Sequence, residues 1–264
     1  MRNKTQHRGL ALITVLALSM LCWNCGSTEA ASAIPKGLLN PLQQADSGTP
    51  VKVAIVPDQT GSRSWTRTPR VSPQNLSPLI DLLRRRGGEI GVGLIRDDSN
   101  RSLVRLRVDR PPAAPKEPDE EGNAFVLLEQ RTRYIGLLEK YEEGRAGWEE
   151  VTREQINTFV STLEPLLNPA RAAAASDVWG ALRRVDSFLA EDDTSWGGSA
   201  SRWAVLVTDG QDNVGVPMAS LASGAQLLVV NGSGSMGALA HLDPTQFESL
   251  DAALRHLVAR EESR

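Results

Sequence analysis

The residues that could do chemistry are acids and alcohols that follow apolar runs in the sequence. Asp58 ends the run VKVAIVPD, and Thr60 and Ser62 follow it at every second position. Asp209 ends a second run, AVLVTD. Two carboxylates at neighbouring strand ends raise each other's pKa unless a cation lies between them. Carboxylate, hydroxyl and water oxygens in octahedral order suit Mg²⁺ or Mn²⁺, so the pattern predicts a divalent-cation site.

Other kinds of chemistry find little support in the sequence. Both cysteines, Cys22 and Cys25, lie close to the N-terminus, so the rest of the chain has no thiol for a disulfide, a zinc–thiolate site or a nucleophile. The histidines, His7, His241 and His256, lie outside the loops that follow the two apolar runs, which disfavours zinc. A formal net charge of −3 gives no general electrostatic reason to bind nucleic acid, and we expect no such partner.

A sheet must bring the two acids to one edge. The spacing of apolar residues predicts an α/β fold of three layers, Rossmann-like, in which helices cover both faces of a mainly parallel sheet. The alternating segment LVRLRV predicts one antiparallel edge strand. Ligands of such sheets bind at the carboxyl ends of the strands, where Asp58 and Asp209 both fall. Strands are predicted at 51–56, 89–95, 103–108, 203–207 and 226–230, and helices at 73–86, 178–189 and 247–258, the last beginning with a short edge strand.

A helical region interrupts this alternation. Residues 123–167 carry two apolar stripes at helical spacing, with Gly144 and Gly147 between them. We interpret them as a helical hairpin, inserted at about 111–170 and packed against part of the sheet. Two roles stay open for the apolar stripe, which is either plain core or a surface for a partner.

The N-terminus predicts export. Residues 1–25 resemble a signal peptide, because basic residues precede an apolar stretch, 10–21, that is too short to span a bilayer comfortably. Lipidation at Cys25, or alternatively at Cys22, would anchor the protein in the bacterial cell envelope. Cleavage at the small residues near 30–33 would instead give a plain periplasmic or secreted protein, and a retained transmembrane anchor is a third possibility.

The remaining boundaries follow from composition. Residues 26–50 are rich in Gly, Ser, Ala, Pro and Gln without apolar periodicity, which predicts a flexible linker. Residues 51–264 then form the folded domain. We therefore expect an extracytoplasmic domain, either tethered to the membrane by a lipid or free.

Three pieces of the sequence, taken in order, resemble the von Willebrand factor A domain. The segment 58–62, DQTGS, resembles that family's D-x-S-x-S motif, with Thr60 in the place of the first serine. The segment 176–182, SDVWGAL, resembles its T-D-[IV]-x-x-A-L stretch, with Ser176 in the place of the metal-binding threonine. The segment 205–213, VLVTDGQDN, resembles its LLTDGxDN strand and loop. The resemblance covers about residues 51 to 110 and 170 to 260.

The resemblance implies a metal-ion-dependent adhesion site. Thr60, Ser62 and Ser176 would supply hydroxyls, and Asp58 and Asp209 would contact Mg²⁺ directly or through water. An acidic side chain of a partner protein would complete the coordination. The protein would then be a metal-dependent protein-binding domain and not an enzyme.

Three other interpretations stay open. Asp58 and Asp209 are also suited to capping strand ends, and Ser176-Asp177 to capping a helix. The chain could be a metal-free scaffold whose helical hairpin makes the contacts. It could also be a Mg²⁺-dependent phosphohydrolase with Asp58 as nucleophile, but residue 60 is not a second acid and no Lys or His stands beside the motif.

Overall fold

A computed structural model describes one compact unit of the chain, which falls within residues 34–264. The predicted signal peptide, with Cys22 and Cys25, lies outside the described residues, as do most of the linker and Ser62. Among the helices of the described residues, none is both long and apolar enough to cross a membrane. The described residues are 48–60, 71–99, 101–118, 123–168, 173–193, 196, 200–212, 214–230 and 237–264.

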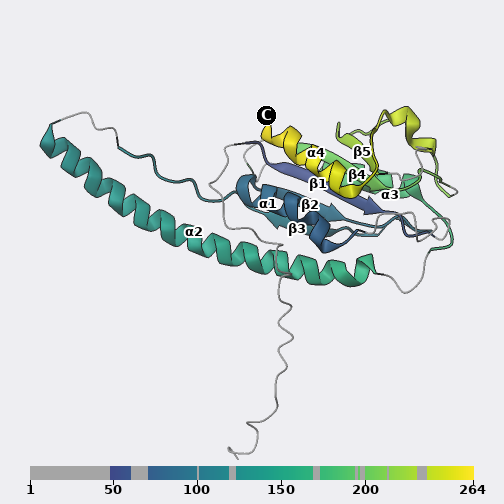
Figure 1. Ribbon diagram of the computed structural model, residues 1–264, viewed down its shortest axis with the longest axis horizontal. Coiled ribbons are helices and arrows are strands. Elements are labelled where there is room, and N and C mark those ends of the chain that lie inside the picture. The colour runs from purple at the N-terminus through teal and green to yellow at the C-terminus, as the bar shows by residue number, and fades with distance from the viewer. Residues whose placement is uncertain are drawn as a thin grey trace, which may run out of the picture. The chain divides into compact units, whose positions relative to one another are not determined.

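The described strands form one six-stranded sheet in the order β3-β2-β1-β4-β5-β6 (Figure 1). All neighbouring strands are parallel except β2 and β3, which are antiparallel. The α/β class, the mainly parallel sheet and the antiparallel edge strand are therefore confirmed. The strands are β1 (Val51–Pro57), β2 (Gly88–Val92), β3 (Val104–Val108), β4 (Ser201–Val207), β5 (Gln226–Val230) and β6 (Thr245–Phe247).

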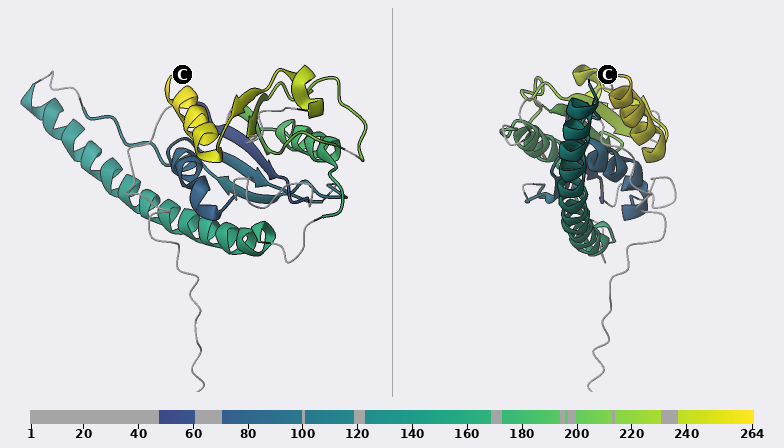
Figure 2. Two further views of the ribbon diagram at one scale, coloured as in Figure 1. Left: turned by 45° about the vertical axis from the view of Figure 1, so that its right-hand side comes forward. Right: turned by 90° about the vertical axis from the view of Figure 1, so that its left-hand side faces the viewer.

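Helices cover both faces of this sheet. Helices α1 and α4 pack together on one face and α3 packs on the other, so the sheet lies between two helical layers (Figures 1 and 2). The predicted helix at 178–189 is confirmed. The short edge strand predicted before the last helix is confirmed as well, because β6 ends at Phe247 and the helix follows from Leu250, after Ser249 as its N-cap. The described helices are η1 (Pro73–Leu76), α1 (Ser77–Arg86), α2 (Ala124–Leu167), α3 (Val178–Leu189), η3 (Gly237–Leu242) and α4 (Leu250–Glu262).

Strand β1 is buried on both faces, and its side chains divide between two cores. Val53 and Ile55 pack with apolar residues of α1, α4 and α2, whereas Ala54 and Val56 pack with those of α3. This alternation follows from the two-residue period of a strand. A buried strand with helices on both sides fixes the position of the residue that follows it.

Helix α2 contradicts the predicted hairpin. It is one continuous helix of 44 residues, with Gly144 and Gly147 in its interior. A glycine inside a helix costs only about 1 kcal/mol, which neighbouring contacts can offset. Arg145 Nε lies 3.0 Å from Glu149 Oε1, four residues later, so a side-chain ion pair spans Gly147. The glycines therefore do not end the helix.

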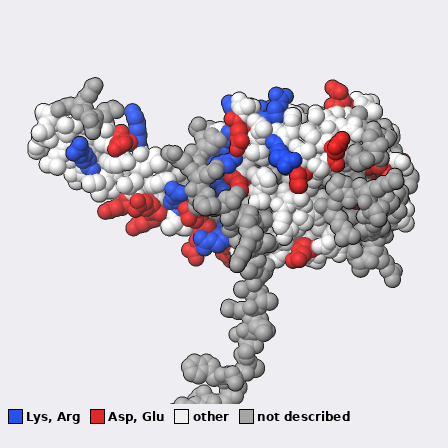
Figure 3. Space-filling view, in the orientation of Figure 1, with Lys and Arg blue, Asp and Glu red and all other residues white. Residues whose placement is uncertain are grey.

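The two halves of α2 have different surroundings. In the C-terminal half, Ile156 and Leu163 are fully buried in the core that also contains α1. The N-terminal half extends past the sheet in Figure 1 and in the left view of Figure 2. There Phe125, Leu128 and Ile135 are 77%, 65% and 57% exposed. Figure 3 shows basic and acidic side chains among uncharged ones along this half.

Candidate metal site

Three of the predicted site residues form a buried hydrogen-bonded cluster at the carboxyl end of β1. Ser176 Oγ donates to Thr60 Oγ1 at 2.8 Å, and Thr60 Oγ1 donates to Asp58 Oδ1 at 2.8 Å. The backbone N–H of Thr60 also donates to Asp58 Oδ1, at 3.0 Å. Asp58, Thr60 and Ser176 are only 6%, 3% and 2% exposed. The structure thus brings together residues that are more than a hundred positions apart.

The backbone around the cluster explains this convergence. Asp58 N–H donates to the carbonyl of Val207 at 2.9 Å, which holds the residue after β1 against the end of β4. Thr60 then pairs with Ala173 in a parallel bridge, and this pairing carries the chain toward Ser176. A single pairing between loops therefore positions the Ser176 hydroxyl.

Asp177 fixes the start of α3 next to this cluster. Its Oδ1 accepts from Gly180 N–H at 2.8 Å, and its own N–H donates to the Arg96 carbonyl at 2.8 Å. A side chain has no room at position 180, because a Cβ there would lie 2.0 Å from Asp177 Oδ2. The expected helix N-cap is thus confirmed for Asp177, whereas Ser176 belongs to the cluster.

Asp209 occupies the same edge of the sheet but not the cluster. Strands β1 and β4 are parallel neighbours, so Asp58 and Asp209 follow adjacent strands. The Asp209 side chain is half-buried, and its Oδ1 accepts from Gln211 N–H at 3.0 Å. Ser62, the remaining predicted hydroxyl, lies outside the described residues.

Two residues of the VTDGQDN segment have roles that the sequence did not reveal. Thr208 is fully buried, and its hydroxyl donates to Asp58 Oδ2 at 2.9 Å. Asp212 Oδ2 accepts from Trp179 N–H at 2.9 Å, in the first turn of α3. A hydroxyl directly after an apolar strand is the signal that could have identified Thr208.

The donor set fits a small hard cation in two respects. Asp58 is a buried carboxylate, and no ion pair joins it to a Lys, Arg or His within the described ranges. A buried carboxylate without a positive partner is costly, and a divalent cation would offset that cost. Neighbouring ligands around octahedral Mg²⁺ lie about 3 Å apart, close to the 2.8 Å between the oxygens of Ser176, Thr60 and Asp58.

The same set is poorly suited to softer metals. Within the part of the chain that the structure describes, no three His, Cys, Asp or Glu side chains gather in one place. The cluster is instead one carboxylate with neutral hydroxyls, which is chemistry that Mg²⁺ or Mn²⁺ tolerates and zinc rarely uses. The hydrogen bonds from Thr60 to Asp58 also form a strand-end turn, so Asp58 has a structural role in addition.

The comparisons with known proteins do not identify a family. No protein-family model matches the chain, and no curated protein sequence is similar to it. A solved structure, the pilus adhesin SpaC from Lactobacillus rhamnosus GG in its open conformation, matches with 12% sequence identity and a TM-score of 0.39. The match covers 83% of this chain but only 30% of the adhesin chain. A likeness at this TM-score carries no argument about fold or function.

Proposed function

We propose that the chain is a metal-dependent protein-binding domain of the von Willebrand factor A type. Asp58, Thr60 and Ser176 would hold Mg²⁺ or Mn²⁺, with Ser62 and Asp209 contributing directly or through water. The bound cation would supply a Lewis acid to which an acidic side chain of a partner protein binds. These residues would hold the cation at the carboxyl edge of the sheet.

The observation that supports this proposal most is the buried Asp58 carboxylate with its surrounding hydroxyls. Three donors from two loops point at its two oxygens. Neither a Lys nor a His contacts it through an ion pair within the described ranges, so the phosphohydrolase alternative lacks a general acid or base beside the carboxylate. A ligand-binding role requires no such group.

Selection of peptides tests this function, because it requires no identified partner. Phage-displayed random peptides are selected on the full-length protein in millimolar Mg²⁺. We expect every enriched peptide to contain an Asp or Glu, to be released by EDTA, and to fail to bind the Asp58→Ala variant. Enriched peptides that bind equally well in EDTA, or after their acid is replaced by its amide, would refute the metal-bridging mechanism.

A metal-free scaffold is the second candidate, and exposed apolar residues on α2 favour it. Phe125 and Leu128 are mostly exposed, and they present an apolar surface to which an amphipathic helix of a partner would fit. Under this alternative, replacing both with Ser removes peptide binding and Asp58→Ala does not. The metal-dependent function predicts the reverse.

We also propose that the domain works outside the cytoplasm, tethered through a lipid on Cys25. Palmitate labelling of cells that express the protein checks this. Label should be lost in Cys25→Ser and retained in Cys22→Ser if Cys25 is the modified residue. Loss of label only in Cys22→Ser would show that Cys22 is the modified residue, and an unlabelled protein would rule out the lipid anchor.

A further inference from the structure

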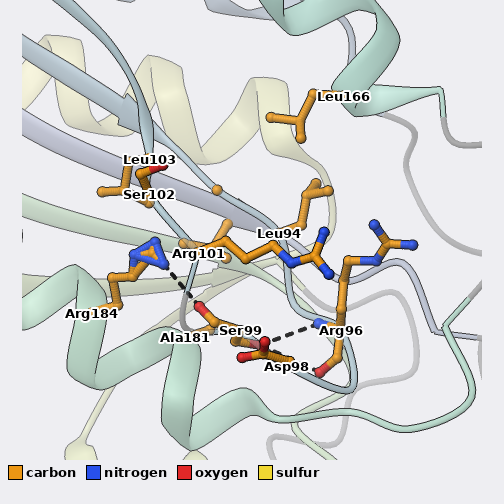
Figure 4. A pocket seen from close by; sticks show the side chains of 12 residues that line it. Leu94, Arg96, Asp98, Ser99, Arg101, Ser102, Leu103, Leu166, Ala181 and Arg184 are labelled. Atoms are coloured by element: carbon orange, nitrogen blue, oxygen red, sulfur yellow. Dashed lines mark hydrogen bonds between the residues drawn. The ribbon is translucent and has the colours of Figure 1, made fainter.

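Figure 4 shows a small pocket lined by arginine and apolar side chains. Its volume is about 60 Å³. Arg96, Arg101 and Arg184 line it. Asp98 is the acidic residue among the described residues of the lining. The lining therefore carries a net charge of two positive in a space that holds only a small chemical group.

One arginine of this pocket has an unsatisfied buried nitrogen, and the three arginines have no carboxylate partner among the described residues. Arg96 Nε is buried without a hydrogen-bond partner. No ion pair connects Arg96, Arg101 or Arg184 to a carboxylate in the part of the chain that the structure describes. Arg105, just outside, differs because both of its terminal nitrogens contact the carboxylate of Glu191. Figure 4 shows the guanidinium ends of Arg96 and Arg101 extending toward the same side of the pocket.

The electrostatic surroundings of Arg184 also favour a bound anion. Burial, together with the nearby positive charge of Arg105, lowers the pKa of the Arg184 guanidinium from its usual value, and Asp98 offsets this only in part. An arginine nevertheless stays charged at neutral pH. Arg184 therefore keeps its positive charge, and a bound anion would relieve the repulsion between Arg184 and Arg105.

We propose that this pocket binds a carboxylate side chain of the partner protein, next to the one that reaches the metal. The inference rests on the proposed function for the existence of a partner. Planar guanidinium groups match a carboxylate with paired hydrogen bonds. Val56, Leu94, Leu103 and Leu166 supply an apolar lining for the methylene groups of an Asp or Glu, which a free phosphate ion lacks.

The pocket and the metal site share backbone. Arg96 follows Ile95, which pairs with Asp58 at the end of β1. Gln59, between Asp58 and Thr60, donates its side-chain amide to the Leu166 carbonyl at 3.1 Å, which ties the end of α2 to the same loop. A partner segment with two acidic side chains would therefore meet both sites at one edge of the sheet.

Titration with a small carboxylate tests the pocket. The probe is N-acetyl-glutamate N-methylamide, added to the full-length protein at constant ionic strength in EDTA, while the Nε–Hε signals of the arginines are followed by NMR. We expect a saturable shift of the Arg96 signal, at least tenfold weaker binding in Arg96→Gln, and unchanged binding in the control Arg133→Gln on exposed α2 surface. The neutral probe N-acetyl-glutamine N-methylamide should cause no shift.

Several results would overturn the inference. These are the absence of a saturable shift, equal binding by the Arg96→Gln and Arg133→Gln variants, or tighter binding of inorganic phosphate than of the glutamate probe. The Asp58→Asn variant separates this inference from the proposed function. It should lose Mg²⁺ binding and keep probe binding, because the titration contains no metal.

Discussion

The Thr208 hydroxyl donates a hydrogen bond of 2.9 Å to Asp58 Oδ2 although 150 positions separate the two residues. Each residue follows a strand, Asp58 after β1 and Thr208 after β4, and these strands are parallel neighbours. The bond orients the carboxylate whose other oxygen accepts from Thr60. Thr208 therefore positions the central acid of the candidate site.

Removal of the Thr208 hydroxyl should weaken metal binding without removing a ligand. We expect Thr208→Val, which keeps the shape of the side chain, to lower Mg²⁺ affinity by roughly 10- to 100-fold, the usual effect of losing a group that orients a metal ligand. Thr208→Ser retains the hydroxyl and is the matched control. Isothermal titration calorimetry measures both, and unchanged affinity in Thr208→Val would mean that this bond does not orient Asp58.

The two halves of α2 should respond differently to the same substitution. Leu163 is fully buried, so Leu163→Ala should lower the free energy of unfolding by about 2–5 kcal/mol. Leu128 is 65% exposed, and Leu128→Ala should change it by less than about 0.5 kcal/mol. Urea denaturation of both variants tests the continuous helix, since a hairpin folded back on itself would make Leu128→Ala costly too.

The buried ion pair of Lys52 and Asp193 should make stability depend on pH. Lys52 Nζ lies 3.1 Å from Asp193 Oδ1, and Arg202 donates to Asp193 Oδ2 at 2.8 Å. Burial raises the pKa of the Asp193 carboxyl, but the hydrogen bonds from Arg202 and Lys52 outweigh it and hold that pKa below its usual 3.8. The carboxylate therefore stabilises the fold above pH 3.8, and its contribution disappears as the pH falls through the lowered pKa.

We accordingly expect Asp193→Asn to lower the free energy of unfolding by about 3 kcal/mol at neutral pH, because Lys52 stays buried without its carboxylate. The difference in the free energy of unfolding between Asp193→Asn and the wild-type protein should shrink progressively below pH 3.8. Asp192→Asn, at the exposed neighbouring position, should change the free energy by less than about 1 kcal/mol. A loss that is the same at every pH would show that the charge of Asp193 is not what stabilises the fold.

Much of the fold could be predicted because its signals are local. The run Val51–Val56 is almost uniformly apolar, as a strand covered on both faces requires, and Val178–Leu189 has a clear helical stripe after the cap at Asp177. The shape of α2 could not be predicted, because Gly144 and Gly147 are compatible with both a turn and a helix interior.

The candidate site was predictable only in part for a similar reason. The spacing after an apolar run identified Asp58 and Thr60, and the resemblance to the von Willebrand factor A motif identified Ser176. The structure brings these three residues together. The role of Thr208 depends on β1 and β4 being neighbours in the sheet. The sequence of a single strand does not reveal which strands lie next to it. The pocket around Arg96 depends on side chains from β1, from loops and from two helices, and no local pattern marks it.

Titration of the full-length protein and of Asp58→Asn with MgCl₂, by calorimetry and by thermal denaturation, tests the central claim most directly. The account predicts that the unchanged protein binds one Mg²⁺ and gains about 2.7 kcal/mol of stability when the cation is present at about 100 times its dissociation constant. Asp58→Asn should fold and show neither effect. The account is contradicted if the unchanged protein releases no binding heat, or if Mg²⁺ stabilises Asp58→Asn to the same extent.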